Sequence, residues 1–269
     1  MNKQASKIDL SNTHIQSKSC ISVSDFHVWI KEAHILNNIQ LNFPENQITC
    51  IVGPSGSGKS TLIRSLNRIN DDVQGLTTKG KVLFDGQDIY DKSVDVAKLR
   101  SEVGMVFQKP CIFPKSISEN VVFGVQQQKK LSKANKEQIV EESLKEVALW
   151  DEVSMRLNDK ASALSIGQQQ RLCIARTLAL KPKVILLDEP TSSLDPVSTR
   201  AIEDMMLKLK EHYTLVFVTH NIQQAKRIAD NLVFVCDGKV IEQGQASRMF
   251  YKPTSPKTAA YLNTEYCEC

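Results

Sequence analysis

Nine consecutive residues combine glycines, a lysine and hydroxyl side chains at the spacing that a phosphate-binding loop requires. An apolar, strand-like run, Ile48 to Val52, precedes them, and a helix-like segment, Leu62 to Asn70, follows. Backbone N–H groups in such a glycine-rich turn point at an anion, and the helix N-terminus adds roughly half a positive charge. We call this segment the phosphate loop, and its residues are Gly53, Pro54, Ser55, Gly56, Ser57, Gly58, Lys59, Ser60 and Thr61.

Two side chains of the phosphate loop carry its expected chemistry. Lys59 supplies a point charge for β- and γ-phosphates, and the Ser60 hydroxyl can ligate Mg²⁺. The alternative is a glycine-rich loop with a chance lysine. Because strand and helix both stand where a phosphate cradle needs them, we predict a nucleoside-triphosphate site.

A second apolar run, residues 184–187, ends in Asp188 and Glu189. In phosphate-loop enzymes such a strand lies beside the phosphate loop, so Asp188 can hold Mg²⁺, usually through water. Glu189 would project toward the γ-phosphate and polarise the attacking water. Taken alone, this pattern more often marks a solvated strand end. The phosphate loop upstream makes the functional interpretation the preferred one.

Two further polar residues follow strand-like runs. His220 comes directly after residues 215–219, and we expect a γ-phosphate contact, although a lone histidine there is more often structural or simply exposed. Gln108 follows Val106-Phe107 and suits a hinge whose amide senses Mg²⁺ or water.

The stretch from Leu164 to Arg171 is a short polar turn that opens a helix. Ser165 and the free backbone N–H groups of that helix end offer another anion site. One chain does not need two phosphate-binding helix ends for one triphosphate. Two chains facing head to tail do, and each would offer this turn to the other's nucleotide.

Apolar runs alternate with helix-like segments along most of the chain, as expected for a parallel sheet covered on both faces. We expect short strands between Ile21 and Leu41 and a mostly helical insertion from about Lys109 to Leu180, with one helix from Ser132 to Trp150. Residues 1–20 are polar, and we expect them to form a disordered extension. Residues 21–269 would then form one domain.

Composition narrows the class of function. Charged residues make up 24% of the 269, and the net charge of +4 is too small to indicate a nucleic-acid partner. No apolar run approaches the ~18 residues that span a bilayer. We therefore expect a cytoplasmic protein whose membrane role, if it has one, depends on a partner.

Six motifs in fixed order resemble those of the ATP-binding-cassette (ABC) ATPases over residues 21–244. The resemblance implies an α/β fold: a RecA-like P-loop NTPase core with a parallel sheet, an antiparallel β subdomain and an inserted helical subdomain. Two such chains would sandwich two ATP molecules. The matching residues are Gly53 to Thr61, Gln108, Leu164 to Gln168, Asp188-Glu189, Ser193-Leu194-Asp195 and His220.

The resemblance also implies roles for individual residues. Glu189 would be the general base, with Lys59, Gln108 and His220 as its catalytic companions. Ser60, Gln108 and Asp188 would hold Mg²⁺. Asp195 would communicate across the dimer. The residues that would hold the partner chain's γ-phosphate are Ser165, Gly167 and Gln168.

Two positions leave questions open. The aromatic residue that stacks on adenine in this family falls near Trp29, but Ile30 is an equally possible alignment, and Trp29 can instead be a buried core residue. Ile166 stands where the family usually has glycine. Because Ile166 is β-branched, a positive φ at this position would be costly.

Several stretches are similar to the ATPases of bacterial phosphate importers. That similarity implies ATP-driven phosphate import by a homodimer bound to two transmembrane permeases at the cytoplasmic face of the cell (inner) membrane, supplied by a periplasmic or extracellular phosphate-binding protein. The alternatives are an importer of another small solute such as a polar amino acid, a soluble cassette ATPase that remodels ribosomes or DNA, and a non-catalytic regulator. The stretches are Ser65 to Asp71, Gly104 to Pro110, Phe113-Pro114, Ser116-Ile117, Gln168 to Arg176 and Leu194 to Thr199.

Overall fold

The computed structural model describes residues 18–263. The polar extension expected for residues 1–20 lies outside this range except for its last three residues. Of these, Ser19 and Cys20 already belong to the first strand, β1 (Ser19–Ile30). The first strand therefore begins two residues before the predicted start at Ile21.

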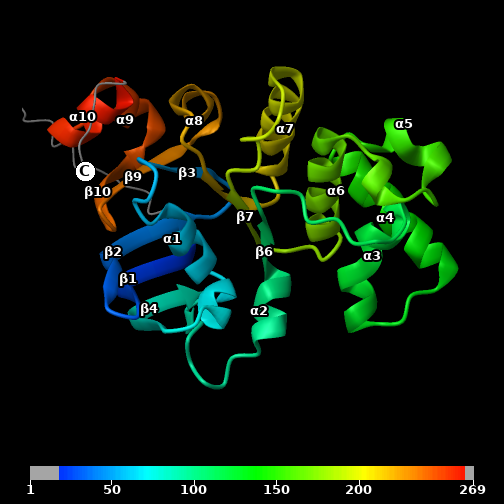
Figure 1. The fold of residues 1–269 in the computed structure, drawn as a ribbon, viewed down its shortest axis with the longest axis horizontal. Coiled ribbons are helices and arrows are strands. Elements are labelled where there is room, and N and C mark those ends of the chain that lie inside the picture. The colour runs from blue at the N-terminus through cyan, green and yellow to red at the C-terminus, as the bar shows by residue number, and fades with distance from the viewer. Residues whose placement is uncertain (1–17, 264–269) are drawn as a thin grey trace, which may run out of the picture.

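A six-stranded sheet forms the centre of the molecule, in the order β10-β9-β3-β8-β7-β6 (Figure 1). Five strands run parallel, and β10 closes the sheet as an antiparallel hairpin with β9. Every residue of β3, β7 and β8 is buried, as expected for apolar runs covered on both faces. The strands are β3 (Ile48–Val52), β6 (Val103–Val106), β7 (Val184–Asp188), β8 (Thr214–Val218), β9 (Asn231–Cys236) and β10 (Lys239–Gln245).

A smaller antiparallel sheet has the order β2-β1-β4-β5. Its members are β1, β2 (Ala33–Pro44), β4 (Leu76–Phe84) and β5 (Gln87–Asp88). The sequence indicates short strands here, but β1 and β2 each span 12 residues. They stay paired because register shifts, with Asp25 and Asn38 at positive φ, absorb the irregular positions.

Four helices form a lobe at one end of the long axis, drawn in green in Figure 1. The expected helix from Ser132 to Trp150 is interrupted. It ends at Glu146 because Ala148 adopts a left-handed conformation, and the Leu149 N–H donates to the Leu144 carbonyl. The helices are α3 (Ile117–Gln128), α4 (Lys133–Glu146), α5 (Trp150–Val153) and α6 (Ile166–Leu178).

The remaining helices lie over the central sheet and around its edges. One hydrophobic cluster joins α1 and the antiparallel sheet to one face of the central sheet, and a second cluster joins α6, α7 and α8 to the other. No helix within residues 18–263 is both long and apolar enough to cross a membrane. These helices are α1 (Lys59–Ser65), α2 (Val96–Glu102), α7 (Pro196–Leu209), α8 (Ile222–Ile228), α9 (Ala246–Tyr251) and α10 (Pro256–Leu262).

Replacing Gly80 by alanine tests the close approach of β4 to β1. A Cβ there would lie 1.9 Å from the Asp25 carbonyl oxygen, whereas a Cβ at Gly86 would meet nothing within 4 Å, and both glycines have positive φ. We expect Gly86→Ala to lower the free energy of unfolding by about 1 kcal/mol. Gly80→Ala should cost about 2–4 kcal/mol, because the clash adds to the strained backbone. Urea unfolding measures both, and equal losses would contradict this packing.

Candidate functional site

The carboxyl ends of four parallel strands bring the candidate residues to one edge of the central sheet. The phosphate loop follows β3, Gln108 follows β6, Asp188 ends β7 and His220 follows β8. Ligands of open α/β sheets bind at this edge. In the sheet, β8 lies between β3 and the strand that carries Asp188, yet Asp188 lies beside the phosphate loop, as predicted, and bonds Ser60.

The phosphate loop has the backbone of an anion cradle. Gly53 and Gly58 have φ of 154° and 95°, and a Cβ at Gly53 would lie 2.0 Å from the Val235 carbonyl oxygen. Glycine is therefore required at Gly53 by space as well as by conformation. The loop encloses a hollow of about 260 Å³, lined by Ile35, Ser55, Gly56, Gly58, Lys59, Ser60, Thr61 and Glu189.

Lys59 lies at the base of this hollow and is almost fully buried. Its ammonium donates to the carbonyl oxygens of Gly53, at 2.8 Å, and Pro54, at 2.7 Å. Burial lowers the pKa of Lys59, and the nearby carboxylates of Glu189 and Asp188 oppose that shift. The result is a desolvated cation that a phosphate group can attract more strongly than a solvated one.

Asp188 is buried and both of its carboxylate oxygens are engaged. Ser60 Oγ donates to Oδ1 at 2.9 Å, and Arg64 Nη2 donates to Oδ2 at 2.9 Å. A hydroxyl and a carboxylate that converge in this way are the oxygen ligands that Mg²⁺ prefers. Ser60 and Asp188 therefore fit the ion that the sequence implies.

Glu189 and His220 face each other across the ends of β7 and β8. His220 Nδ1 lies 3.0 Å from Glu189 Oε2. Glu189 has φ of 48°, and its backbone N–H donates to the Val218 carbonyl at 3.1 Å. A non-glycine residue in this conformation stores on the order of 1–3 kcal/mol of strain and persists only where its surroundings hold it.

Gln108 is exposed at the end of β6, and its amide Nε2 donates to Ser192 Oγ at 3.1 Å. Ser192 lies in the loop after Glu189, so Gln108 contacts the segment that follows the carboxylates. The structure thus brings Gln108 to the same sheet edge as Asp188, with its amide on Ser192.

The turn that begins α6 is a complete capping box. Ser165 Oγ accepts from the Gln168 N–H, and the Gln168 side chain accepts from the Ser165 N–H. Ile166 is the first residue of α6 and has no positive φ, so the strain expected at this position is absent. Instead, Ile166 simply exposes 54% of its surface. The positive φ that would have been costly for Ile166 does not occur, because the turn is helical at this residue.

Gly167 packs closely against the start of α7. A Cβ there would lie 2.8 Å from Ser198 Oγ, and Ser198 donates in turn to Asp195 at 2.6 Å. Asp195 caps α7 by accepting from the N–H groups of Val197 and Ser198. Hydrogen bonds from Ser198 lower the pKa of Asp195. The starts of α6 and α7 are thus in contact within one chain.

Trp29 lies on the outer face of the antiparallel sheet. Its ring stacks on His34, with centroids 4.5 Å apart, and on His27, at 5.4 Å. Trp29 is partly exposed and lies outside both hydrophobic clusters, so the structure does not support a buried core tryptophan. Ile35, the residue after His34, lines the hollow of the phosphate loop.

Some residues at the site were not identified from sequence. Arg64 could have been, because it follows Ser60 by four residues and lies on the same face of α1. Ser192 had no comparable signal, since its partner Gln108 lies 84 residues away in sequence. Ser198 is three residues from its partner Asp195, but nothing in the sequence indicated its contact with Gly167.

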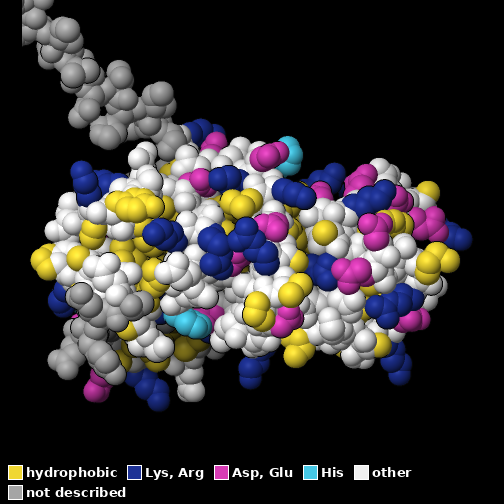
Figure 2. Space-filling view, turned by 90° about the horizontal axis from the view of Figure 1, so that it is seen from above, with side chains coloured by type: hydrophobic (Ala, Val, Ile, Leu, Met, Phe, Trp, Pro, Cys, Tyr) yellow, Lys and Arg dark blue, Asp and Glu magenta, His cyan; other side chains and the backbone are white. Residues whose placement is uncertain are grey.

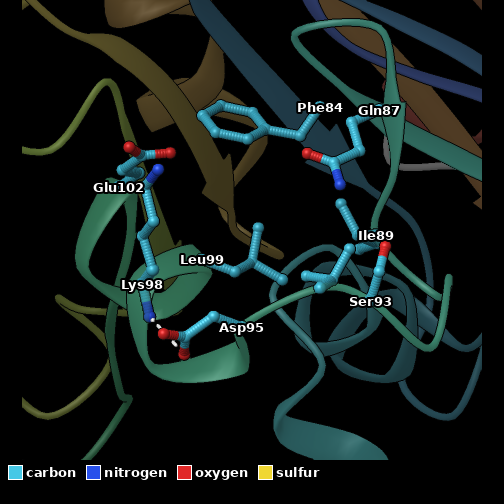
Figure 3. A pocket seen from close by; sticks show the side chains of 9 residues that line it. Phe84, Gln87, Ile89, Ser93, Asp95, Lys98, Leu99 and Glu102 are labelled. Atoms are coloured by element: carbon cyan, nitrogen blue, oxygen red, sulfur yellow. Dashed lines mark hydrogen bonds between the residues drawn. The ribbon is translucent and has the colours of Figure 1, made fainter.

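A separate small pocket lies between the antiparallel sheet and α2 (Figure 3). Its apolar lining includes Phe84, Ile89 and Leu99. Asp95, Lys98 and Glu102 add charged groups to the lining. None of the candidate site residues lines this pocket. Positive and negative side chains are interspersed over the face seen in Figure 2, without a continuous field of one sign.

A phosphate loop at the carboxyl end of β3, with a hydroxyl and a carboxylate beside it, places the chain among the phosphate-loop nucleoside-triphosphate-binding proteins. The family model described as ABC transporter matches residues 36–192, which is more than half of the chain. The chain therefore belongs to the ABC transporter family of ATP-binding proteins.

Curated relatives match the chain over nearly its full length. The phosphate import ATP-binding protein PstB of Pseudoalteromonas translucida is 48% identical over 97% of this chain and 94% of its own. PstB of Thermotoga maritima is 51% identical over 90% and 96%. Among solved structures, cbiO1 of Clostridium perfringens, part of the ABC transporter complex cbiONQ, has 29% identity and a TM-score of 0.76, covering 91% of this chain and 95% of that one. The similarity confirms the expected α/β fold and family.

Arg64→Met tests whether the buried carboxylate of Asp188 depends on its ion pair with Arg64. Removing the guanidinium leaves Oδ2 of a buried carboxylate without its partner. We expect a loss of about 1–2 kcal/mol in the free energy of unfolding, reduced from the value for a buried pair because Arg64 is partly exposed. Lys133→Met, which removes an exposed pair with Glu137, should cost less than about 0.5 kcal/mol. Urea unfolding that gives both variants the same stability would show that Asp188 does not depend on Arg64.

Proposed function

We propose that this chain is the ATP-hydrolysing subunit of an ABC importer that brings inorganic phosphate into the cell. The observation that carries this proposal is that relatives 46–51% identical, aligned over at least 90% of this chain, are phosphate import ATP-binding proteins. The geometry supports the ATPase part independently, because Lys59, Ser60 and Glu189 line one hollow and Asp188 bonds Ser60 at its wall.

The residues of the hollow then have distinct tasks. The phosphate-loop N–H groups bind the phosphate oxygens, and Lys59 exchanges its carbonyl partners for the β- and γ-phosphates. Ser60 and Asp188 would hold Mg²⁺, with Gln108 nearby, and this ion supplies charge neutralisation for the phosphates. Glu189 accepts a proton from the attacking water, and His220 holds the Glu189 carboxylate and contacts the γ-phosphate. Trp29, or Ile30 beside it, meets the adenine.

A second copy of the chain completes each site. Ser165, Gly167 and Gln168 open α6 in the helical lobe, and their hydrogen bonds and packing involve the capping box, Glu152 and Ser198 rather than the phosphate loop. In a head-to-tail homodimer this helix end would face the partner's γ-phosphate. Asp195 is linked to Gly167 through Ser198. Through this contact, closure of the dimer at one nucleotide site would be communicated to the other.

Coupling to transport requires partners in the membrane. We infer two permease subunits that hold the ATPase dimer at the cytoplasmic face of the cell (inner) membrane, and a phosphate-binding protein outside it. The helical subdomain, about 109–180, would move when ATP binds and the dimer closes. Phe107, which is exposed after β6, and Phe113, which packs on Phe123 and Arg176, lie on the segment that would receive the permease.

One experiment tests both the ATPase role and the transported solute. It measures uptake of labelled phosphate in cells that lack other phosphate uptake routes. We expect Lys59→Ala to abolish uptake, because the hollow loses its buried cation. Lys133→Ala, which changes an exposed lysine on α4, should transport normally. Native uptake by the Lys59 variant would leave the cargo open, and the next solute to test is a polar amino acid.

Glu189→Gln tests the general base and the dimer. The amide keeps the size of the side chain but cannot take a proton, so ATP should bind and stay unhydrolysed. We expect turnover at least a hundredfold lower and an ATP-bound dimer in sedimentation with Mg²⁺. Glu141→Gln, on an exposed face of α4, is the matched control. A variant that still sediments as a monomer argues against the two-chain site.

A further inference from the structure

A buried polar cluster lies directly behind Glu189 and His220. Its central residue is Gln224 on α8, which is 1% exposed. Glu203 comes from α7, Thr191 from the loop after β7, and Thr219 follows β8. Arg227, on α8 like Gln224, closes the cluster on its partly exposed side.

Gln224 satisfies both ends of its amide within this cluster. Its Oε1 accepts from Thr219 Oγ1 at 2.9 Å and from Thr191 Oγ1 at 3.2 Å. Its Nε2 donates to Glu203 Oε1 at 3.1 Å and lies 3.0 Å from Thr191 Oγ1. Turning the amide over would direct its oxygen at the Glu203 carboxylate. Glu203 therefore determines which way the amide points.

Glu203 is itself held in one orientation. Arg227 donates to both of its oxygens, at 2.7 and 2.6 Å, although Glu203 is only 1% exposed. Burial raises the pKa of Glu203, but the hydrogen bonds from Arg227 and Gln224 outweigh it, and the net shift is downward. An ionised Glu203 can only accept a hydrogen bond from the Gln224 amide. The amide nitrogen of Gln224 must therefore face Glu203, and its oxygen must face the threonines.

The two threonines connect this cluster to the proposed site. Thr219 immediately precedes His220, and Thr191 follows Glu189 by two residues. Gln224 therefore joins the two loops whose side chains meet at 3.0 Å, Glu189 Oε2 to His220 Nδ1. Glu189 is in a strained conformation, which requires such support from its surroundings.

We propose that Gln224 is a positioning residue for the hydrolysis step, holding the loops of Glu189 and His220 at a fixed separation, with Glu203 and Arg227 orienting its amide. The proposal rests on the roles given above to Glu189 and His220. It assigns Gln224 no contact with nucleotide, since Gln224 lies beneath the loops and not in the hollow.

The consequence is a separation between turnover and binding. ATP binding depends mainly on the phosphate loop, whereas hydrolysis depends on where the Glu189 carboxylate lies. Loss of the Gln224 amide should thus lower kcat and leave KM for ATP nearly unchanged. A merely structural role would lower stability and disturb both.

The experiment measures kcat and KM for ATP with the full chain assembled in its transporter complex. We expect Gln224→Leu, which keeps the volume and removes the amide, to lower kcat at least tenfold with KM within twofold of native. Gln224→Glu should also be at least tenfold slower, because its carboxylate opposes that of Glu203. The double variant Gln224→Glu, Glu203→Gln exchanges the two groups, so that one carboxylate again faces one amide. It should recover kcat to within threefold of native.

A second set of variants distinguishes loss of the positioning contacts from a general loss of folding. Thr219→Val removes one hydroxyl from the cluster and should lower kcat about threefold to tenfold. Thr177→Val removes a buried hydroxyl that bonds the Cys173 carbonyl on α6, and it should keep native turnover. Thermal unfolding of each variant reports whether the fold is retained.

The outcomes separate the two proposals. Native kcat in Gln224→Leu and Thr219→Val, or no recovery in the exchanged pair, overturns the positioning role of Gln224. An equal loss of kcat in Thr177→Val also overturns it, since any buried hydroxyl would then do the same. If Glu189→Gln hydrolyses ATP at the native rate, it is instead the role of Glu189 that fails.

Discussion

The hydrogen bond from Ser60 to Asp188 is the interaction on which the candidate site depends. It joins the phosphate loop to the end of β7 across 128 residues of sequence, and Arg64 holds the other carboxylate oxygen. The bond forms although β8 lies between β3 and β7, because parallel strands end at one edge and α1 leans over that edge. Everything proposed for the nucleotide, from the buried ammonium of Lys59 to the carboxylate of Glu189, requires these two segments to remain together.

A second layer of interactions supports the reactive side chains from below. Glu189 is strained, and His220 is exposed, so neither would keep its place unaided. The amide of Gln224 holds both of their loops, and the buried carboxylate of Glu203, paired with the partly exposed Arg227, holds the amide. Replacing one member leaves other buried polar groups without partners, which makes such a network sensitive to single changes.

The two helix ends outside the hollow form a separate unit. Ser165 caps α6, Asp195 caps α7, and Gly167 brings the two ends into contact at Ser198. A side chain at Gly167 would clash with Ser198, so this glycine is explained by packing between α6 and α7 within the chain. Under the proposed function this same unit faces the nucleotide of the second copy, and movement of the helical lobe would reach Asp195 directly.

The sequence by itself determined the phosphate loop, the acidic end of β7 and the parallel α/β class, because these follow from residue type, short spacing and apolar runs. It did not determine where α4 ends, the ordinary helical φ of Ile166, or the order that puts β8 between β3 and β7. Nor did it indicate the cluster around Gln224, whose partners lie 5 to 33 residues away. The strand order and the Gln224 cluster were decided only by tertiary structure, since hydrogen bonds between separate segments exist only after the sheet and its helices have packed.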